Sequence, residues 1–259
     1  MSCLARARGR FALSPGAKLV GWLPVLVSAV GVTLLLALNG TVWRGRGDAL
    51  LPTARVVETV APLAVGLQAA FLLSPEDEPP LELLLTSPRP LWRVLAERAL
   101  AMAALQGSVA LIGSLVALAL GVNESLALAT ARWAAPSVFV GGAALAVSVW
   151  TRRGNLSALV TLLLWGGMLV GGSAAGEHIF FLRPVPVFMQ PTGASLAAYA
   201  RNRMSLILIG LALVGSAAYA TRDEERMLGV RQPPHSGWSH WLKLSLAGLV
   251  GGLVMFYAG

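Results

Sequence analysis

Long apolar runs, separated by short charged or proline-rich breaks, follow one another along almost the whole chain. Most runs reach the roughly 20 residues that an α-helix needs to cross a hydrocarbon core of about 30 Å. Only α-helices and closed β-barrels pair all of their backbone amide groups in lipid. None of the runs shows the alternating pattern of a β-barrel strand, so each is expected to be helical. The approximate spans are 19–38, 56–74, 96–121, 133–150, 156–173, 204–221 and 242–258.

The composition agrees with a lipid-facing surface. Hydrophobic residues make up 56% of the chain, charged residues only 12%, and the mean hydropathy is +0.71. A soluble domain carries about a quarter charged residues, because its surface faces water. No stretch between the predicted spans is long enough for a soluble domain of useful size. The sequence therefore predicts an all-α integral membrane protein with one membrane domain.

The basic residues indicate an orientation. The chain has 20 Lys and Arg residues against 12 Asp and Glu residues, a net charge of +8. They lie in short loops rather than on one basic face, so they predict topology and no binding of nucleic acid. A cytoplasmic N-terminus places 13 of the 20 on the cytoplasmic side. We expect a multi-pass protein of the cell inner (plasma) membrane with its N-terminus in the cytoplasm.

The breaks after the second and fifth spans are unusual. The stretch 174–203 is semi-apolar and contains three prolines, which predicts a re-entrant or interfacial segment on the outer side. On the cytoplasmic side, the acidic residues 76–78 and Pro79-Pro80 are typical of a helix start. Leu81–Leu85 then forms one or two turns before Ser87-Pro88 ends the helix. This short apolar helix either docks into a partner or lies on the lipid headgroups.

Three motifs resemble the permease subunits of ABC-2 type ATP-binding-cassette transporters. The first, Glu82-Leu83-Leu84-Leu85-Thr86-Ser87-Pro88, resembles the segment between the second and third spans of that family. The tight basic turn 148–155 and the acidic tail 223–228 resemble family features after the fourth and sixth spans. Where the family usually has Gly-Thr before the glutamate, this chain has Pro80-Leu81.

The resemblance implies a six-span, type V exporter-like helical bundle over residues 1–229. Residues 230–259 would then hold a cytoplasmic linker and a seventh, C-terminal transmembrane helix. Residues 78–90 correspond to a coupling helix that inserts into a separate ATPase subunit. The residues expected to transmit the energy of ATP hydrolysis are Glu82, Leu83, Leu84, Leu85 and Arg89.

The resemblance also implies the partners. Two permeases, identical copies or paralogues, would assemble with two copies of the ATPase subunit in the lipid bilayer and export a substrate. This chain has no Gly-x-x-x-x-Gly-Lys-Ser/Thr phosphate loop, so ATP and Mg²⁺ are expected on the partner and no cofactor on this chain. Alternatives are a haem-exporter-like permease of cytochrome c maturation and a non-transporting subunit that anchors the ATPase or transmits its force. An intramembrane enzyme would need catalytic motifs that the sequence lacks, so no enzyme is predicted.

Three polar residues inside the predicted spans are candidates for a functional role. Glu58, Gln68 and Gln106 either line a pathway or lie at helix interfaces, because polar groups in lipid are costly. A single glutamine more often forms a helix-to-helix hydrogen bond than a substrate contact. No metal site is expected, because the three histidines are divided between the two sides and Cys3 is the only cysteine.

Overall fold

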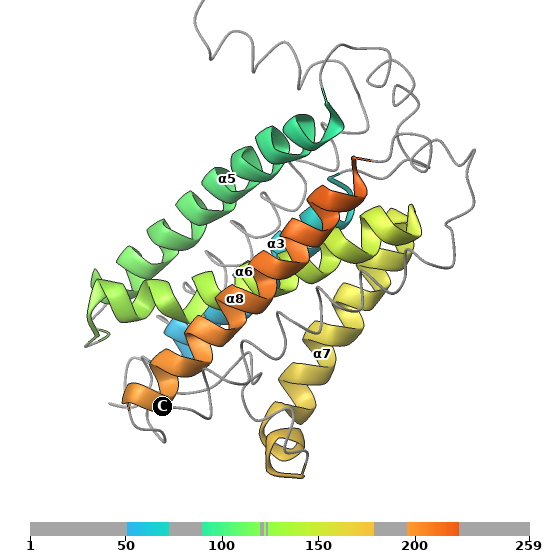
Figure 1. Ribbon diagram of the computed structural model, residues 1–259. Coiled ribbons are helices and arrows are strands. Elements are labelled where there is room, and N and C mark those ends of the chain that lie inside the picture. Colours follow the sequence, from blue (N-terminus) through green and yellow to red (C-terminus); the bar gives the residue numbers. More distant parts are fainter. Residues whose placement is uncertain (1–50, 73–89, 120–121, 123, 179–195, 223–259) are drawn as a thin grey trace, which may run out of the picture.

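The described part of the protein is a bundle of α-helices. A computed structural model describes residues 51–72, 90–119, 122, 124–178 and 196–222, and all regular structure in these ranges is helical. The helices are α3 (Leu51–Ala70), α5 (Leu91–Ala119), α6 (Leu126–Thr151), α7 (Gly154–His178) and α8 (Leu196–Ala220) (Figure 1).

The bundle has the character of a membrane domain. The helices α5, α6 and α8 are each long and apolar enough to cross a bilayer, and α3 and α7 contain shorter apolar helices, Val57–Ala70 and Gly154–Gly167. The prediction of an all-helical membrane protein is confirmed for the described residues. The predicted spans 19–38 and 242–258 lie outside those residues, as does the segment 179–195 of the predicted re-entrant stretch.

Several helices begin earlier than the predicted spans. The helix α5 starts at Leu91, α6 at Leu126 and α8 at Leu196. The predicted spans 133–150 and 204–221 begin directly after a charged residue. In the structure these charged residues, Arg132 and Arg203, lie within the first turns of the helices. The start of α6 is fixed by Ser125, whose hydroxyl accepts a hydrogen bond from the backbone nitrogen of Leu128 at 3.3 Å, a typical N-cap.

The helix α6 forms the centre of the bundle and packs against α3, α7 and α8 (Figure 1). In its apolar span 67% of the residues are buried, against 22% in α5. The approach of α6 to α8 is close because glycines meet at the crossing, Gly142 on α6 and Gly210 on α8. Small residues allow such close contacts between helices in membranes.

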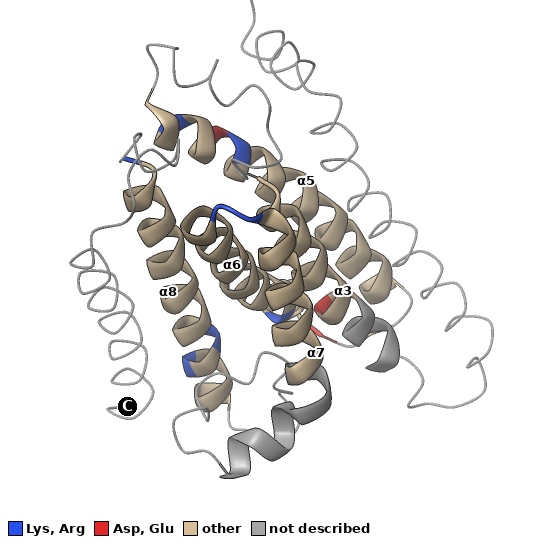
Figure 2. Ribbon diagram, turned by 90° about the vertical axis from the view of Figure 1, so that its right-hand side faces the viewer, with Lys and Arg blue, Asp and Glu red and all other residues tan. Residues whose placement is uncertain are grey.

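Chain neighbours run in opposite directions, so the bundle has two distinct ends. The Glu58 end holds the first turns of α3, α6 and α8. The Arg98 end holds the last turns of those helices and the first turns of α5 and α7. Figure 2 shows that the charged residues of the described helices gather towards these two ends. At the Arg98 end, a buried cluster that includes Ala70, Leu91, Val149 and Ala217 joins α3, α5, α6 and α8.

Candidate functional site

A buried ion pair joins α3 to α8 at the Glu58 end. Nη2 of Arg203 donates a hydrogen bond to Oε1 of Glu58 at 2.9 Å, and each side chain is only 4% exposed. The two residues are 145 positions apart in the chain. Removing both charges from water costs several kcal/mol per ion, so the pair exists only because each charge has a partner. Glu58 is one of the three polar residues singled out within the predicted spans, and its partner in the structure is Arg203.

A tyrosine supports the arginine of this pair. The guanidinium of Arg203 lies over the ring of Tyr199, 4.7 Å from its centroid. The two residues are four positions apart in α8 and therefore share one face of the helix. A desolvated cation–π contact of this kind contributes about 2 kcal/mol. Tyr199 is 2% exposed, and its hydroxyl has no hydrogen-bond partner among the described residues.

A second ion pair lies at the same end of the bundle. Nη2 of Arg132, in the second turn of α6, contacts Oε1 of Glu124, just before that helix. Both side chains are largely buried. Within the described part of the chain, Nε of Arg132 and Oε2 of Glu124 have no hydrogen-bond partner. The Glu58 end therefore holds two buried ion pairs, with Arg201 of α8 as a further basic residue.

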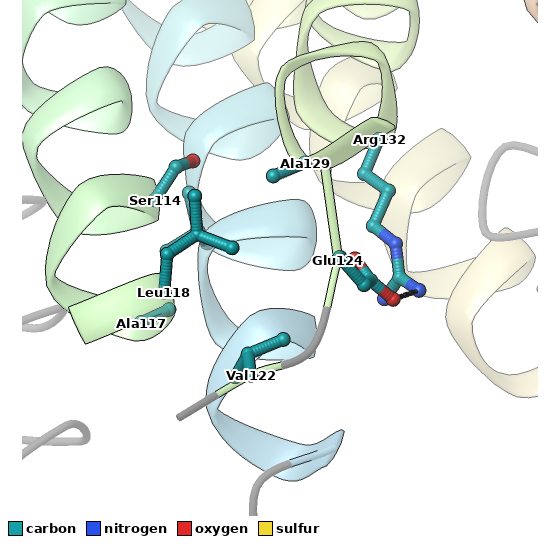
Figure 3. Close-up of a pocket in the computed structure, with 8 residues that line it drawn as sticks. Ser114, Ala117, Leu118, Val122, Glu124, Ala129 and Arg132 are labelled. Atoms are coloured by element: carbon teal, nitrogen blue, oxygen red, sulfur yellow. Dashed lines mark hydrogen bonds and ion pairs between the residues drawn. The ribbon is translucent and has the colours of Figure 1, made fainter. Parts of the chain in front are cut away.

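A small pocket adjoins the second pair. Figure 3 shows Glu124 and Arg132 facing each other on one side, with Ser114 and Leu118 of α5 on the other and Val122 below them. Its free volume is about 10 Å³, room for a single water molecule. The hydroxyl of Ser114 is already engaged, because it accepts a hydrogen bond from Nε1 of Trp133 at 3.1 Å. The pocket is too small for a substrate.

Prolines follow both buried charges at the same spacing. Pro62 lies four residues after Glu58 in α3, and Pro136 lies four residues after Arg132 in α6. Proline has no N–H, so the carbonyl groups of Glu58 and Arg132 lack their usual helical donor. Such a position is where a helix bends most easily. The next carbonyl of α3, that of Thr59, accepts a hydrogen bond from Nε1 of Trp165 in α7 at 2.8 Å.

The predicted glutamines lie together. Nε2 of Gln106 in α5 donates a hydrogen bond to Oε1 of Gln68 in α3 at 3.0 Å, and both side chains are buried. The structure therefore places them in a direct contact between helices. Glu58 lies in the same helix as Gln68 but nearly three turns away, so the three predicted residues do not form one site.

The predicted coupling residues Glu82, Leu83, Leu84, Leu85 and Arg89 lie outside the described residues. The structure does describe the residues on either side of this segment, at the end of α3 and the start of α5. Nη1 of Arg98 in α5 donates to the carbonyl oxygen of Leu72, just after α3, at 2.9 Å. The hydroxyl of Ser148 in α6 donates to the carbonyl oxygen of Ala70 at 2.6 Å. The end of α3 is therefore tied to both α5 and α6.

The basic turn between α6 and α7 lies at the same end. Arg152 adopts a left-handed backbone conformation, with φ 63° and ψ 13°, and ends α6 as its C-cap. Thr151 is held beside it, since its hydroxyl donates to the carbonyl oxygen of Val147 at 2.7 Å. Between Thr151 and Gly154 the chain reverses direction with only two intervening residues.

Sequence reasoning missed Arg203, Tyr199, Arg132 and Glu124 as members of a site. The predicted spans 133–150 and 204–221 begin directly after Arg132 and Arg203, which places both arginines in loops and not in helices. One signal pointed to them: an acidic residue inside a span, Glu58, requires a basic partner. Nothing in the sequence identifies which of the arginines supplies it.

Among the described residues no group of three or more His, Cys, Asp and Glu side chains is arranged to hold a metal ion. The ion pair between Glu58 and Arg203 joins α3 to α8, which suits a contact that fastens helices together. No protein-family model, no curated protein and no solved structure matches this chain.

Proposed function

We propose that this chain is the membrane-spanning permease subunit of an ABC-2 type ATP-binding-cassette transporter. It forms a six-span bundle with an added C-terminal helix, and moves a substrate across the cell inner membrane with energy from ATP. The ATP and Mg²⁺ are bound by a separate ATPase subunit. Two permeases, identical or paralogous, and two ATPase subunits make up the working transporter.

One observation carries the proposal: the three motifs that resemble the family all adjoin the Arg98 end of the bundle. The segment 82–88 lies between the end of α3 and the start of α5, the turn 148–155 joins α6 to α7, and the tail 223–228 follows α8. A peripheral ATPase can contact only one side of the membrane. Motifs scattered over both ends of the bundle would have argued against a shared role in binding it.

The base of the proposed coupling segment suits the transmission of force. Arg98 ties the end of α3 to α5, and Ser148 ties it to α6. Leu91, at the start of α5, is 2% exposed and belongs to the same buried cluster as Ala70 and Ala217. A push that reaches Leu72 or Leu91 is therefore passed on to the last turns of α3, α6 and α8.

The distribution of basic residues supports a cytoplasmic Arg98 end. Arg93, Arg98, Arg152, Arg153 and Arg222 all lie there. Three arginines with described side chains lie at the Glu58 end: Arg201, and Arg132 and Arg203, which are buried in ion pairs with acidic partners and so withdrawn from the headgroup region. The remaining bias follows the positive-inside rule and supports an N-terminus in the cytoplasm.

The proposal is tested by co-expressing the chain with candidate ATP-binding-cassette ATPases of its own organism and purifying the complex in nanodiscs. We expect equal numbers of the two subunits. The variants Leu83→Asp and Leu84→Asp should lose the ATPase, since a charge at an apolar docking tip is left desolvated. The matched variant Leu84→Met keeps size and apolarity and should retain it.

The alternatives predict other results. A chain that binds no ATPase in any nucleotide state would refute the proposal. A complex that hydrolyses ATP in proteoliposomes but moves none of a panel of lipid-linked and amphipathic substrates would favour the non-transporting, force-transmitting subunit. Complex formation that survives Leu84→Asp would move the coupling contact away from residues 82–85.

A further inference from the structure

The helix α8 is held in three different ways along its length. At the Arg98 end its small residues Ala217 and Ala220 belong to the apolar cluster. In the middle, Gly210 lies directly against the backbone of α6. At the Glu58 end its bridge to α3 is the ion pair between Arg203 and Glu58. Between the glycine contact and the ion pair, Leu206 and Ile209 of α8 pack in an apolar cluster with α6. At the Glu58 end α8 is thus held to α6 by apolar contacts and to α3 by charge.

An ion pair is a poor choice for permanent attachment. Replacing a buried pair by apolar residues of similar volume is often neutral or stabilising, because the desolvation cost of the charges disappears. Its distinctive property is that water can replace each partner, which an apolar contact does not permit. The pair between Glu58 and Arg203 therefore fits a contact that must break and re-form.

Two local features suit repeated opening. Pro62 removes the helical donor of the Glu58 carbonyl, so α3 bends most easily one turn from the pair. The ring of Tyr199 supports the guanidinium of Arg203 from within α8, so the arginine keeps one partner when it leaves Glu58. The glycine contact between Gly142 and Gly210 offers a crossing point about which α8 can rock.

We infer that Glu58 and Arg203 form a latch, which holds the Glu58 end of the bundle closed and opens when α8 rocks about its crossing with α6. The role of this opening in releasing a substrate rests on the proposed function. The opening itself is a property of the bundle and can be measured without an ATPase.

The test measures how accessible to water a buried position next to the latch becomes. Ala135 of α6 is 1% exposed and belongs to the same buried cluster as Leu206, one turn beyond Arg203. A cysteine is placed there in a Cys3→Ser background, and its reaction with a water-soluble maleimide is timed in nanodiscs. A cysteine in place of Ala220, which is 3% exposed at the Arg98 end, serves as the control position.

The latch is broken by Glu58→Gln or by Arg203→Gln. Glu58→Gln leaves the charge of Arg203 buried without its partner, which can prevent folding. Arg203→Gln leaves only the Glu58 carboxyl group, which can take up a proton in the apolar bundle, so this variant keeps the fold. Either change should speed labelling at position 135 by about tenfold or more, with position 220 still protected. Arg222→Gln, which removes one exposed arginine just after α8, should leave both positions protected.

Two results would overturn the latch. Position 135 remaining protected in a folded Arg203→Gln protein would mean that the pair does not hold this end closed. Labelling that rises equally at positions 135 and 220 would mean that the pair only stabilises the fold as a whole. Neither result depends on whether an ATPase binds, so failure of the latch and failure of the proposed transporter are separate outcomes.

Discussion

Gly142 of α6 and Gly210 of α8 lie backbone to backbone. A Cβ atom added to Gly142 would come within 2.5 Å of the carbonyl oxygen of Gly210, and one added to Gly210 would come within 2.5 Å of the carbonyl oxygen of Val138. The neighbouring atoms are backbone, which cannot rotate aside as a side chain can. The distance between the two helices is therefore set by the absence of side chains at this crossing.

Replacing Gly210 by alanine should destabilise the bundle. The added methyl group forces α6 and α8 apart, and overpacking of this kind costs about 1–3 kcal/mol. Thermal unfolding in detergent measures the effect. Gly215→Ala in the same helix is the control, because nothing lies within 4 Å of the added Cβ atom. Equal stability of the two variants would contradict the close approach.

The hydrogen bond between Gln106 and Gln68 should appear as a coupling energy. In a cycle of Gln68→Leu, Gln106→Leu and the double variant, each single change leaves the other amide in an apolar interface. We expect the double variant to be more stable than the sum of the single effects, by about 0.6 kcal/mol and at most about 1.7 kcal/mol, as for such bonds in membrane proteins. Additive effects would show that the bond does not hold α3 to α5.

Arg98→Ala should loosen the end of α3. The hydrogen bond from its guanidinium to the Leu72 carbonyl involves a charged donor and contributes about 1.5–3 kcal/mol. Hydrogen exchange at the amides of Phe71 and Leu72 should therefore quicken by about tenfold or more. Arg93→Ala removes an equal charge from an exposed position in the same helix and should leave these amides unchanged.

Arg152→Gly should raise the stability of the turn between α6 and α7. Arg152 has φ 63°, a conformation that costs a residue with a Cβ atom about 1–2 kcal/mol and costs glycine nothing. We expect a rise of up to about 1 kcal/mol in the free energy of unfolding. Arg153→Gly removes the same charge from the next position, which does not adopt a positive φ, and should give no gain.

The sequence predicted the helices of the described part better than their ends. Their number and order follow from apolar runs, since burial in lipid requires a closed pattern of backbone hydrogen bonds. The predicted ends differ from the observed ones where the pattern places a charged residue in water and the structure places it in a helix. Arg132 and Arg203 lie inside helices because acidic partners replace water around them, Glu124 from eight positions earlier and Glu58 from 145 positions earlier.

The candidate site was predicted only in part. Glu58, Gln68 and Gln106 stand out because each is polar within an apolar run. Arg203 does not stand out, because its neighbours Arg201 and Asn202 give that stretch the look of a loop. Its role depends on a contact between α3 and α8, and no local pattern encodes a pairing over 145 positions.

That separation has a consequence for biosynthesis. A ribosome that adds roughly 5–20 residues per second needs about 7–30 seconds to travel from codon 58 to codon 203. Throughout this time α3 has been made and its arginine partner has not. The carboxyl group of Glu58 is therefore accommodated without Arg203 during this time, and the bundle can close around Glu58 only after α8 has left the ribosome.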